Sequence, residues 1–258
     1  MATPVGPYAR SNSLLEALPQ RSRRALIQAS EPVELVFGTP LCLPGEELRH
    51  VYFPSTGYIS LITPAGASES LEVGLVGYEG IFGITLLLDI NTSPLLGLVQ
   101  GSGVALRMSA SRFRRAADEI VAFRRILHRY LYVLTAQLAQ TAACGRFHLL
   151  DARMARWMLM THDRAVDDTF RLTHEFLAQM LGVRRAGVTE VAGRLQKQKL
   201  ISYHRGVVEI LDRDGLESAS CPCYQAFNDM YKLHLGVENA PKSTQANGQQ
   251  TVAHLMIK

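Results

Sequence analysis

Basic side chains concentrate in one short stretch of the chain. Residues 171–205 contain seven Lys or Arg residues against only Glu175 and Glu190, a net charge of +5. The whole chain of 258 residues has a formal net charge of only +4. A local positive surface is what neutralisation of nucleic-acid phosphates requires. A solvated helix face would carry the same charges, so charge alone leaves both interpretations open.

The same stretch has the pattern of two short helices joined by a tight turn. Thr173 is placed to cap a first helix, and Gly182 stands where that helix would end in a left-handed residue. A second helix is predicted from about Arg184, because Val188, Val191, Ala192 and Leu195 repeat at helical spacing. Two short helices joined by a Gly-containing turn predict a helix-turn-helix.

Two arginines at the front of the second helix break a local preference. Arg184 and Arg185 place cations where the helix dipole favours anions, at a cost of about 0.3–1 kcal/mol each. Such violations often mark functional positions. Guanine N7 and O6 in the major groove would accept hydrogen bonds from arginine's planar fork. The alternative is a pair of ordinary surface arginines.

A basic hairpin is predicted directly after the second helix. LISY and VVEIL read as two short strands around His204-Arg205-Gly206, which predicts a wing suited to the phosphate backbone. The residues expected to contact double-stranded DNA are Thr173, His174, Arg184, Arg185, Gly187, Thr189, Glu190, Arg194, Lys197, His204 and Arg205.

A long helix is predicted between this region and the N-terminal half. Its apolar stripe, expected to form a homodimer interface with two-fold symmetry matching a palindromic DNA site, consists of Leu127, Leu131, Leu134 and Leu138. A helix packed on its own domain would show the same stripe.

The N-terminal half reads as a small antiparallel roll. Short apolar runs separated by Gly, Pro, Ser and Asn occupy residues 33–108, after one or two short helices within 14–29. The expected fold class is α+β. The expected boundaries are a disordered leader at 1–12, a sensor domain at 13–118, a dimerisation helix at 119–147, a winged helix-turn-helix with a final helix capped at Asp214 within 148–236, and a disordered tail at 237–258.

The chain resembles the Crp/Fnr family of bacterial regulators. The segment LTHEFLAQMLGVRRAGVTEVAGRLQKQKLIS, residues 172–202, carries that family's helix-turn-helix form, and the resemblance extends over about residues 14–224. It implies a cyclic-nucleotide-binding-like β-roll, a dimer helix and a winged domain. It further implies that Arg185 reads guanine, that Glu190 faces bases, and that RNA polymerase is a partner.

By this resemblance, residues 76–97 would form the effector loop. The expected pocket residues are Gly77, Glu79, Gly80, Phe82, Gly83, Ser93 and Pro94. No Lys or Arg lies between Arg49 and Arg107, and burying a phosphodiester without a cation costs several kcal/mol. Cyclic-nucleotide binding is therefore disfavoured, and a ligand-independent regulator with a degenerate sensor is the alternative.

The residue types and motifs of the chain do not predict an enzyme or a metal site. The roll offers only His50 for a cupin-like metal enzyme, and no catalytic motif is present, so no catalytic or metal-ligating residue is expected. Four cysteines in this distribution do not predict an iron–sulfur cluster, and Cys221-Pro-Cys223 supplies at most part of a site. No apolar run reaches membrane-spanning length and the start lacks a secretory signal, so a cytoplasmic protein without a membrane partner is expected.

Overall fold

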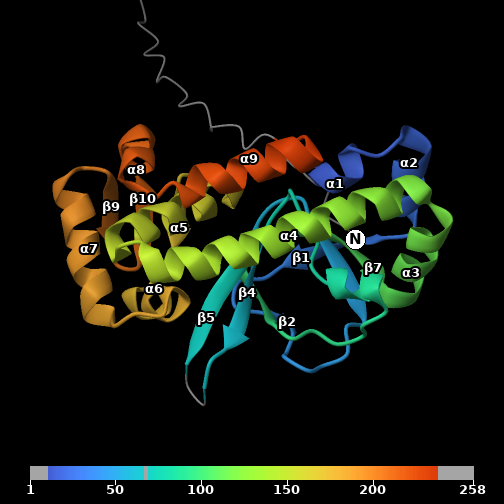
Figure 1. Ribbon diagram of the computed structural model, residues 1–258, viewed down its shortest axis with the longest axis horizontal. Coiled ribbons are helices and arrows are strands. Elements are labelled where there is room, and N and C mark those ends of the chain that lie inside the picture. The colour runs from blue at the N-terminus through green and yellow to red at the C-terminus, as the bar shows by residue number, and fades with distance from the viewer. Residues whose placement is uncertain (1–10, 67–68, 238–258) are drawn as a thin grey trace, which may run out of the picture.

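The computed structural model describes residues 11–66 and 69–237. Its N-terminal part is an antiparallel roll of two sheets, and its C-terminal part is a smaller helical unit with a three-stranded sheet; the long helix α4 runs between them (Figure 1). This arrangement confirms the predicted α+β fold.

Two sheets share the core of the roll. One has the order β1-β7-β3 and is built from Glu31–Leu35, Gly103–Ser109 and His50–Pro54. The other has the order β2-β6-β4-β5 and is built from Pro40–Cys42, Leu96–Gly101, Tyr58–Pro64 and Ser70–Val76. Val51 and Phe53 of β3 alternate inward and meet Ile59 and Leu61 of β4 in one core. The three-residue strand β2 was not predicted.

Helices close the roll. They are α1 (Ser13–Glu16), α2 (Gln20–Gln28), the 3₁₀ helix η1 (Ile84–Leu88) and α3 (Ala110–Glu119). Asn12 was expected in a disordered leader, but it is buried and caps α1, while its amide group donates to the Pro54 and Gly80 carbonyls. Residues 1–10 of that predicted leader lie outside the described part of the chain.

Helix α4 (Val121–Phe147) has 27 residues, which makes it about 40 Å long. One side packs on the roll, and the last helix, α9 (Cys223–Leu235), lies along another side (Figure 1). The Tyr231 hydroxyl of α9 donates to Gln137 Oε1 of α4 across 3.0 Å. The C-terminal unit is therefore attached to the long helix over much of its length.

The C-terminal unit has its own core. Its remaining elements are α5 (Leu150–Arg164), β8 (Thr169–Arg171), α6 (His174–Leu181), α7 (Arg185–Lys197), β9 (Ile201–His204), β10 (Val207–Ile210) and α8 (Arg213–Ala219). The final helix was predicted as one element starting at Leu216 with Asp214 as its cap. The structure instead has two helices, and Asp212 caps α8 by accepting from Gly215 N–H. Of the tail predicted from 237, Val237 is buried, and the rest lies outside the described residues.

Candidate nucleic-acid interface

The first helix of the motif begins and ends at the predicted residues. Thr173 Oγ1 accepts from Phe176 N–H at 3.1 Å, which satisfies one free donor at the start of α6. Gly182 ends the helix with φ 63°, a conformation that costs glycine little. The Val183 N–H then returns to the Ala178 carbonyl at 2.9 Å. This local geometry sets the sharp angle between α6 and α7.

The second helix buries its predicted apolar side. Val188, Val191, Ala192 and Leu195 face the core of the C-terminal unit. Gly187 packs closely, because a Cβ there would lie 3.1 Å from Leu150 Cδ2. Gly193 faces open space, so only the first of these two glycines is needed for a slim helix.

The two arginines at the front of α7 are exposed. Arg184 is the N-cap residue and makes no side-chain capping bond, and Arg185 is the first residue of the helix. Arg185 Nε lies 3.9 Å from Glu175 Oε2, and both side chains are more than two-thirds exposed. An exposed pair at this distance holds the guanidinium only weakly. Both guanidinium groups therefore remain accessible from outside.

His174 connects the two helices to the wing. Its Nδ1 lies 2.9 Å from Thr189 Oγ1, and its ring stacks on Tyr203 with centroids 4.4 Å apart. Burial and the nearby charge of Arg185 lower the pKa of His174, which favours the neutral ring in this contact. His174 and Thr189 thus bond to each other, and Tyr203, which the sequence analysis missed, holds the wing against α6.

Arg194 is tied to a neighbouring helix. Its guanidinium donates to both carboxylate oxygens of Asp151 in α5, at 2.7 and 2.8 Å, and to Glu190 Oε1 at 2.5 Å. The hydrogen bond from Arg194 lowers the pKa of Asp151. The i,i+4 spacing of Glu190 and Arg194 was visible in the sequence, whereas Asp151 was not predicted. Arg194 and Glu190 therefore help fix α7 on α5.

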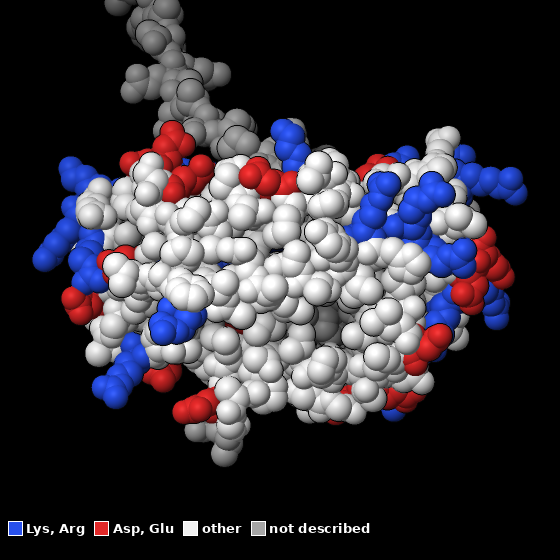
Figure 2. Space-filling view, in the orientation of Figure 1, with Lys and Arg blue, Asp and Glu red and all other residues white. Residues whose placement is uncertain are grey.

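The wing has the predicted hairpin. β10 pairs with β9 and β8, and the two-residue turn holds Arg205 at φ 49° and Gly206 at φ 77°, the positive values that tight hairpins require. His204, Arg205 and Lys197 are exposed. Figure 2 shows Lys and Arg side chains gathered at the end of the molecule where Figure 1 places α7 and β9.

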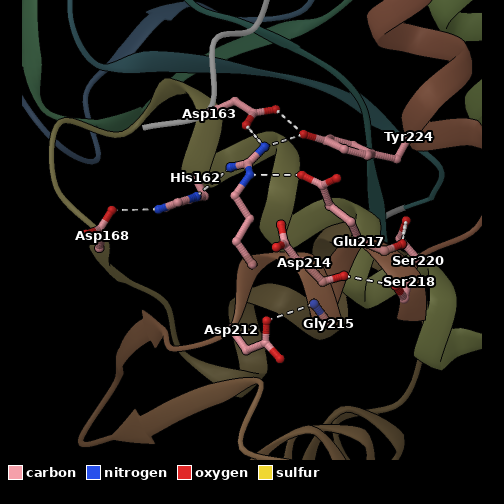
Figure 3. Close-up of polar contacts among 11 residues, drawn as sticks. His162, Asp163, Asp168, Asp212, Asp214, Gly215, Glu217, Ser218, Ser220 and Tyr224 are labelled. Carbon is pink, nitrogen blue, oxygen red and sulfur yellow. Dashed lines mark hydrogen bonds and ion pairs between the residues drawn. The ribbon is translucent and has the colours of Figure 1, made fainter. Parts of the chain in front are cut away.

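A polar network fixes α8 and α9 behind the wing (Figure 3). The Arg213 guanidinium donates to Asp163 Oδ1 at 2.7 Å and to Glu217 Oε1 at 2.9 Å. The Tyr224 hydroxyl donates to Asp163 Oδ2 at 3.0 Å, and His162 Nε2 lies 2.8 Å from Asp168 Oδ1. These groups satisfy one another, so the network positions helices. The sequence analysis did not single out Arg213.

The predicted effector loop packs against helices from two parts of the chain. Glu79 is fully buried, and its Oε1 accepts from Arg164 Nε of α5 at 2.8 Å. A Cβ at Gly77 would lie 2.7 Å from Arg164 Cγ, and one at Gly80 would lie 2.5 Å from the Tyr130 hydroxyl. A ligand at Glu79 would have to displace Arg164. Within the described residues, the only cation paired with this glutamate therefore comes from the C-terminal unit.

The other predicted pocket residues have different surroundings. The Phe82 ring is buried inside the roll, 2.3 Å from where a Cβ of Gly97 would lie, and Gly83 adopts φ 93° at the start of η1. The Ser93 hydroxyl donates to the Leu95 carbonyl, and the Ser93 carbonyl accepts from Gly45 N–H. Pro94 is exposed. Ser93 and Glu79 thus bond to different partners and do not converge on one ligand position.

The predicted leucine stripe is not an open interface. Leu127 and Leu134 are buried in the core shared with the roll, and Leu131 and Leu138 pack against that core. The alternative given in the sequence analysis, a helix packed on its own domain, therefore accounts for the burial of Leu127 and Leu134. Leu127 and Leu134 are therefore not available to a partner helix, whereas Leu131 and Leu138 are only half-buried and their place in a dimer interface stays a prediction.

No helix in residues 11–66 or 69–237 is long and apolar enough to cross a lipid bilayer.

Three cysteines and His148 lie together at the α4–α5 junction and could hold a metal ion.

Comparisons with known proteins identify the domain and the fold. Residues 152–219 match the Crp-like helix-turn-helix domain. The chain is 33% identical over 86 residues to the HTH-type transcriptional regulator Cmr of Mycobacterium tuberculosis, a match that covers 33% of each chain, so it spans about a third of that relative. It is 23% identical over 206 residues to the global nitrogen regulator of a Nostoc species, covering 76% of this chain and 92% of that protein.

A solved structure extends the likeness beyond this domain. FixK2 from Bradyrhizobium japonicum superimposes with a TM-score of 0.63 at 15% identity, covering 74% of this chain and 98% of that one. Both sequence relatives are named as regulators. Residues 152–219 therefore form a Crp-like helix-turn-helix domain, and the chain has a fold similar to that of FixK2.

Proposed function

We propose that this protein is a sequence-specific regulator that binds a palindromic DNA site as a dimer, with α7 in the major groove. The observation that carries the proposal is the pair of exposed arginines, Arg184 and Arg185, at the front of α7, beside the basic turn of the wing. Cations at this end of a helix oppose its dipole, and DNA acceptors would offset that cost. As a DNA-binding regulator it would act in the cytoplasm, with RNA polymerase as a partner.

Arg185→Ala tests the recognition assignment. Selection from random duplexes would first define the preferred site, and fluorescence anisotropy would then measure Kd at several salt concentrations. We expect the variant to lose about 1–3 kcal/mol, or about 5- to 150-fold in affinity, and to relax selectivity at one base pair. Arg24→Ala, which removes an exposed arginine on the distant helix α2, is the matched control. Unchanged affinity and selectivity in Arg185→Ala would exclude the assignment.

A second variant separates phosphate contacts from base reading. Lys197 is exposed near the end of α7 and is expected to contact the backbone. Lys197→Ala should weaken binding to all duplexes about equally. It should also reduce the slope of log Kd against log salt concentration by about one, as expected for the loss of one phosphate contact. A loss restricted to one sequence would contradict this role.

The proposed dimer uses the exposed side of α4, which borders the half-buried Leu131 and Leu138 of the leucine stripe. Tyr132, Ala139, Ala142 and Phe147 are exposed at roughly helical spacing on this face, and Leu149 follows with 80% of its surface exposed. Figure 2 shows that the centre of the molecule, where α4 runs in Figure 1, carries few charged side chains. Such an uncharged face suits a second copy of the same helix.

Ala139→Arg tests this interface. The variant should run as a monomer in size-exclusion chromatography with light scattering and should lose affinity for a palindromic site more than for a half-site. Arg24→Ala should remain a dimer. A dimer that persists in Ala139→Arg would place the interface elsewhere.

For the sensor, we propose that the loop around Glu79 does not take a cyclic nucleotide. The observation that favours this reading is the Arg164–Glu79 pair, because the nearby cation is already neutralised by a carboxylate. Thermal-shift measurements with cyclic mono- and dinucleotides should show no stabilisation. A nucleotide that stabilised the protein and also changed its DNA affinity would overturn this proposal, since linkage requires both effects.

A further inference from the structure

Four potential metal ligands meet at the junction between α4 and α5. The Sγ atoms of Cys144, Cys221 and Cys223 and a ring nitrogen of His148 all lie within 4.8 Å of one another. Cys144 Sγ is 3.5 Å from Cys221 Sγ, and Cys223 Sγ is 3.5 Å from His148 Nδ1. The three cysteines are buried, and His148 is half-buried. Three of the four cysteines in the chain thus converge with a histidine on one point.

The fold brings two sequence-distant pairs together. Cys144 lies in the last turn of α4 and His148 is the C-cap residue, four positions later and on the same side. Cys221 lies between α8 and α9, and Cys223 is the first residue of α9. The Cys221 N–H donates to the Ala152 carbonyl of α5. The sequence analysis expected no metal, because Cys221-Pro-Cys223 alone supplies only part of a site.

The distances suit a tetrahedral zinc ion. With Zn–S bonds of about 2.3 Å and Zn–N bonds of about 2.0–2.1 Å, neighbouring donors in a tetrahedron are separated by about 3.8 Å for S–S and about 3.6 Å for S–N. Two of the observed separations are 3.5 Å, within a few tenths of an ångström of these values, and the others, which are at most 4.8 Å, exceed them by no more than about 1 Å. A Cys₃His set is a typical closed structural zinc site.

The surroundings suit a bound metal thiolate centre. Three thiolates and a neutral histidine around Zn²⁺ carry a net charge of −1, and Arg156, itself 94% buried, acts electrostatically on Cys144 and Cys221. Arg156 Nε has no hydrogen-bond partner, and its guanidinium lies over the Phe227 ring. Gln140 Nε2 donates to Cys223 Sγ at 3.0 Å, the kind of supporting bond that orients a ligand.

We propose that Cys144, His148, Cys221 and Cys223 bind one Zn²⁺ ion that ties the α8–α9 segment to the end of α4. The ion would fix the junction from which α5, and with it α7, extends. Because zinc would hold this junction in one geometry, its removal should loosen the orientation of the recognition helix. This effect on DNA binding rests on the function proposed above, whereas metal binding itself does not.

Metal content of the full-length protein is the primary test. The chain would be purified in the presence of a non-chelating reductant, and its zinc would be measured by elemental mass spectrometry. We expect about one zinc ion per chain, with large losses in Cys144→Ser, Cys221→Ser and His148→Ala. Cys42→Ser is the matched control, because Cys42 is also buried but lies in β2, far from the junction in sequence. Equal zinc loss in Cys42→Ser would overturn the proposal.

A second measurement on the unaltered chain guards against variants that fail to fold. Replacing the metal with Co²⁺ should produce the visible absorption of a tetrahedral site together with thiolate-to-metal charge-transfer bands. Zinc should raise Tm by about 5–10 °C at a concentration a hundredfold above its Kd. Absence of both cobalt bands and stabilisation in the reduced chain, or a Cys144–Cys221 disulfide in place of metal, would refute the zinc site.

DNA binding distinguishes this proposal from the previous one. Zinc retained in a chain that ignores all duplex DNA would refute only the regulator function. A chain that binds its DNA site equally well with and without its zinc would refute the coupling.

Discussion

The buried ion pair between Glu79 and Arg164 provides a sharp test of how the roll and the C-terminal unit are joined. Glu79→Leu would leave the Arg164 guanidinium, whose side chain is 2% exposed, without its counter-charge. Breaking one partner of a buried pair costs about 3–5 kcal/mol. For a chain of this size that corresponds to a fall in Tm of about 6–20 °C. Arg164 would retain its bond from Nη1 to the Met160 carbonyl, at 2.7 Å, which supplies no counter-charge.

A double-mutant cycle isolates the contribution of the pair. Arg164→Met should be destabilising for the same reason, since Glu79 would then be the unpaired charge. The double variant Glu79→Leu/Arg164→Met should cost less than the sum of the two single changes, with a coupling of about 3 kcal/mol, at the upper end of the usual range for contacting residues. This reduced cost is expected because both charges are removed together.

Urea unfolding provides the assay, because the chain has a single tryptophan, Trp157, whose Nε1 donates to Glu72 of the roll. Its fluorescence reports the junction between roll and α5, and far-UV circular dichroism reports the whole fold. Single variants that each cost less than about 1 kcal/mol, or costs that simply add in the double variant, would refute the reasoning.

Three further predictions concern stability. Burial raises the pKa of Glu72 to about 7 despite hydrogen bonds from Ser60 and Trp157; because this lies above the unfolded value, the folded state binds more protons, and its stability should fall by about 3 kcal/mol between pH 4.5 and 7. Glu72→Gln should abolish this slope in urea titrations, and an unchanged slope would exclude Glu72 as its source. Gly193→Ala should raise stability by about 0.5–1 kcal/mol in chemical denaturation, because its Cβ would meet open space; a loss of stability would contradict that geometry. Asp212→Ala should cost about 1 kcal/mol by removing the α8 cap, whereas an unaffected Tm would show that the cap is dispensable.

Polar contacts between described residues link the roll directly to the C-terminal unit. Besides the Glu79–Arg164 pair, Trp157 Nε1 lies 2.7 Å from Glu72 Oε1, and Gln179 Nε2 donates to Ser70 Oγ at 2.7 Å. The first two are buried, so their bonds form in a low-dielectric environment and break only at substantial cost. The orientation of α6 and α7 therefore depends on residues of β5 and the loop that follows it.

The local elements of the helix-turn-helix and the wing could be predicted from the sequence because they are encoded by neighbouring residues. The cap at Thr173, the left-handed Gly182 and the buried positions from Val188 to Leu195 each depend on short-range geometry and a 3.6-residue period. The hairpin around Arg205-Gly206 follows from the same kind of local signal. From these features the sequence predicted a helix-turn-helix domain with Arg184 and Arg185 on its surface.

Tertiary structure decided which residues meet across long separations. An apolar stripe predicts only that one face of a helix is buried, without indicating what covers it. The sequence therefore could not show that the roll of the same chain buries Leu127 and Leu134. Nor could spacing reveal that Glu79 pairs with Arg164, 85 positions away, or that Cys144 lies beside Cys221, 77 positions away. Pairing energy depends on distance in space and on burial, and both are set only when the two units pack against α4.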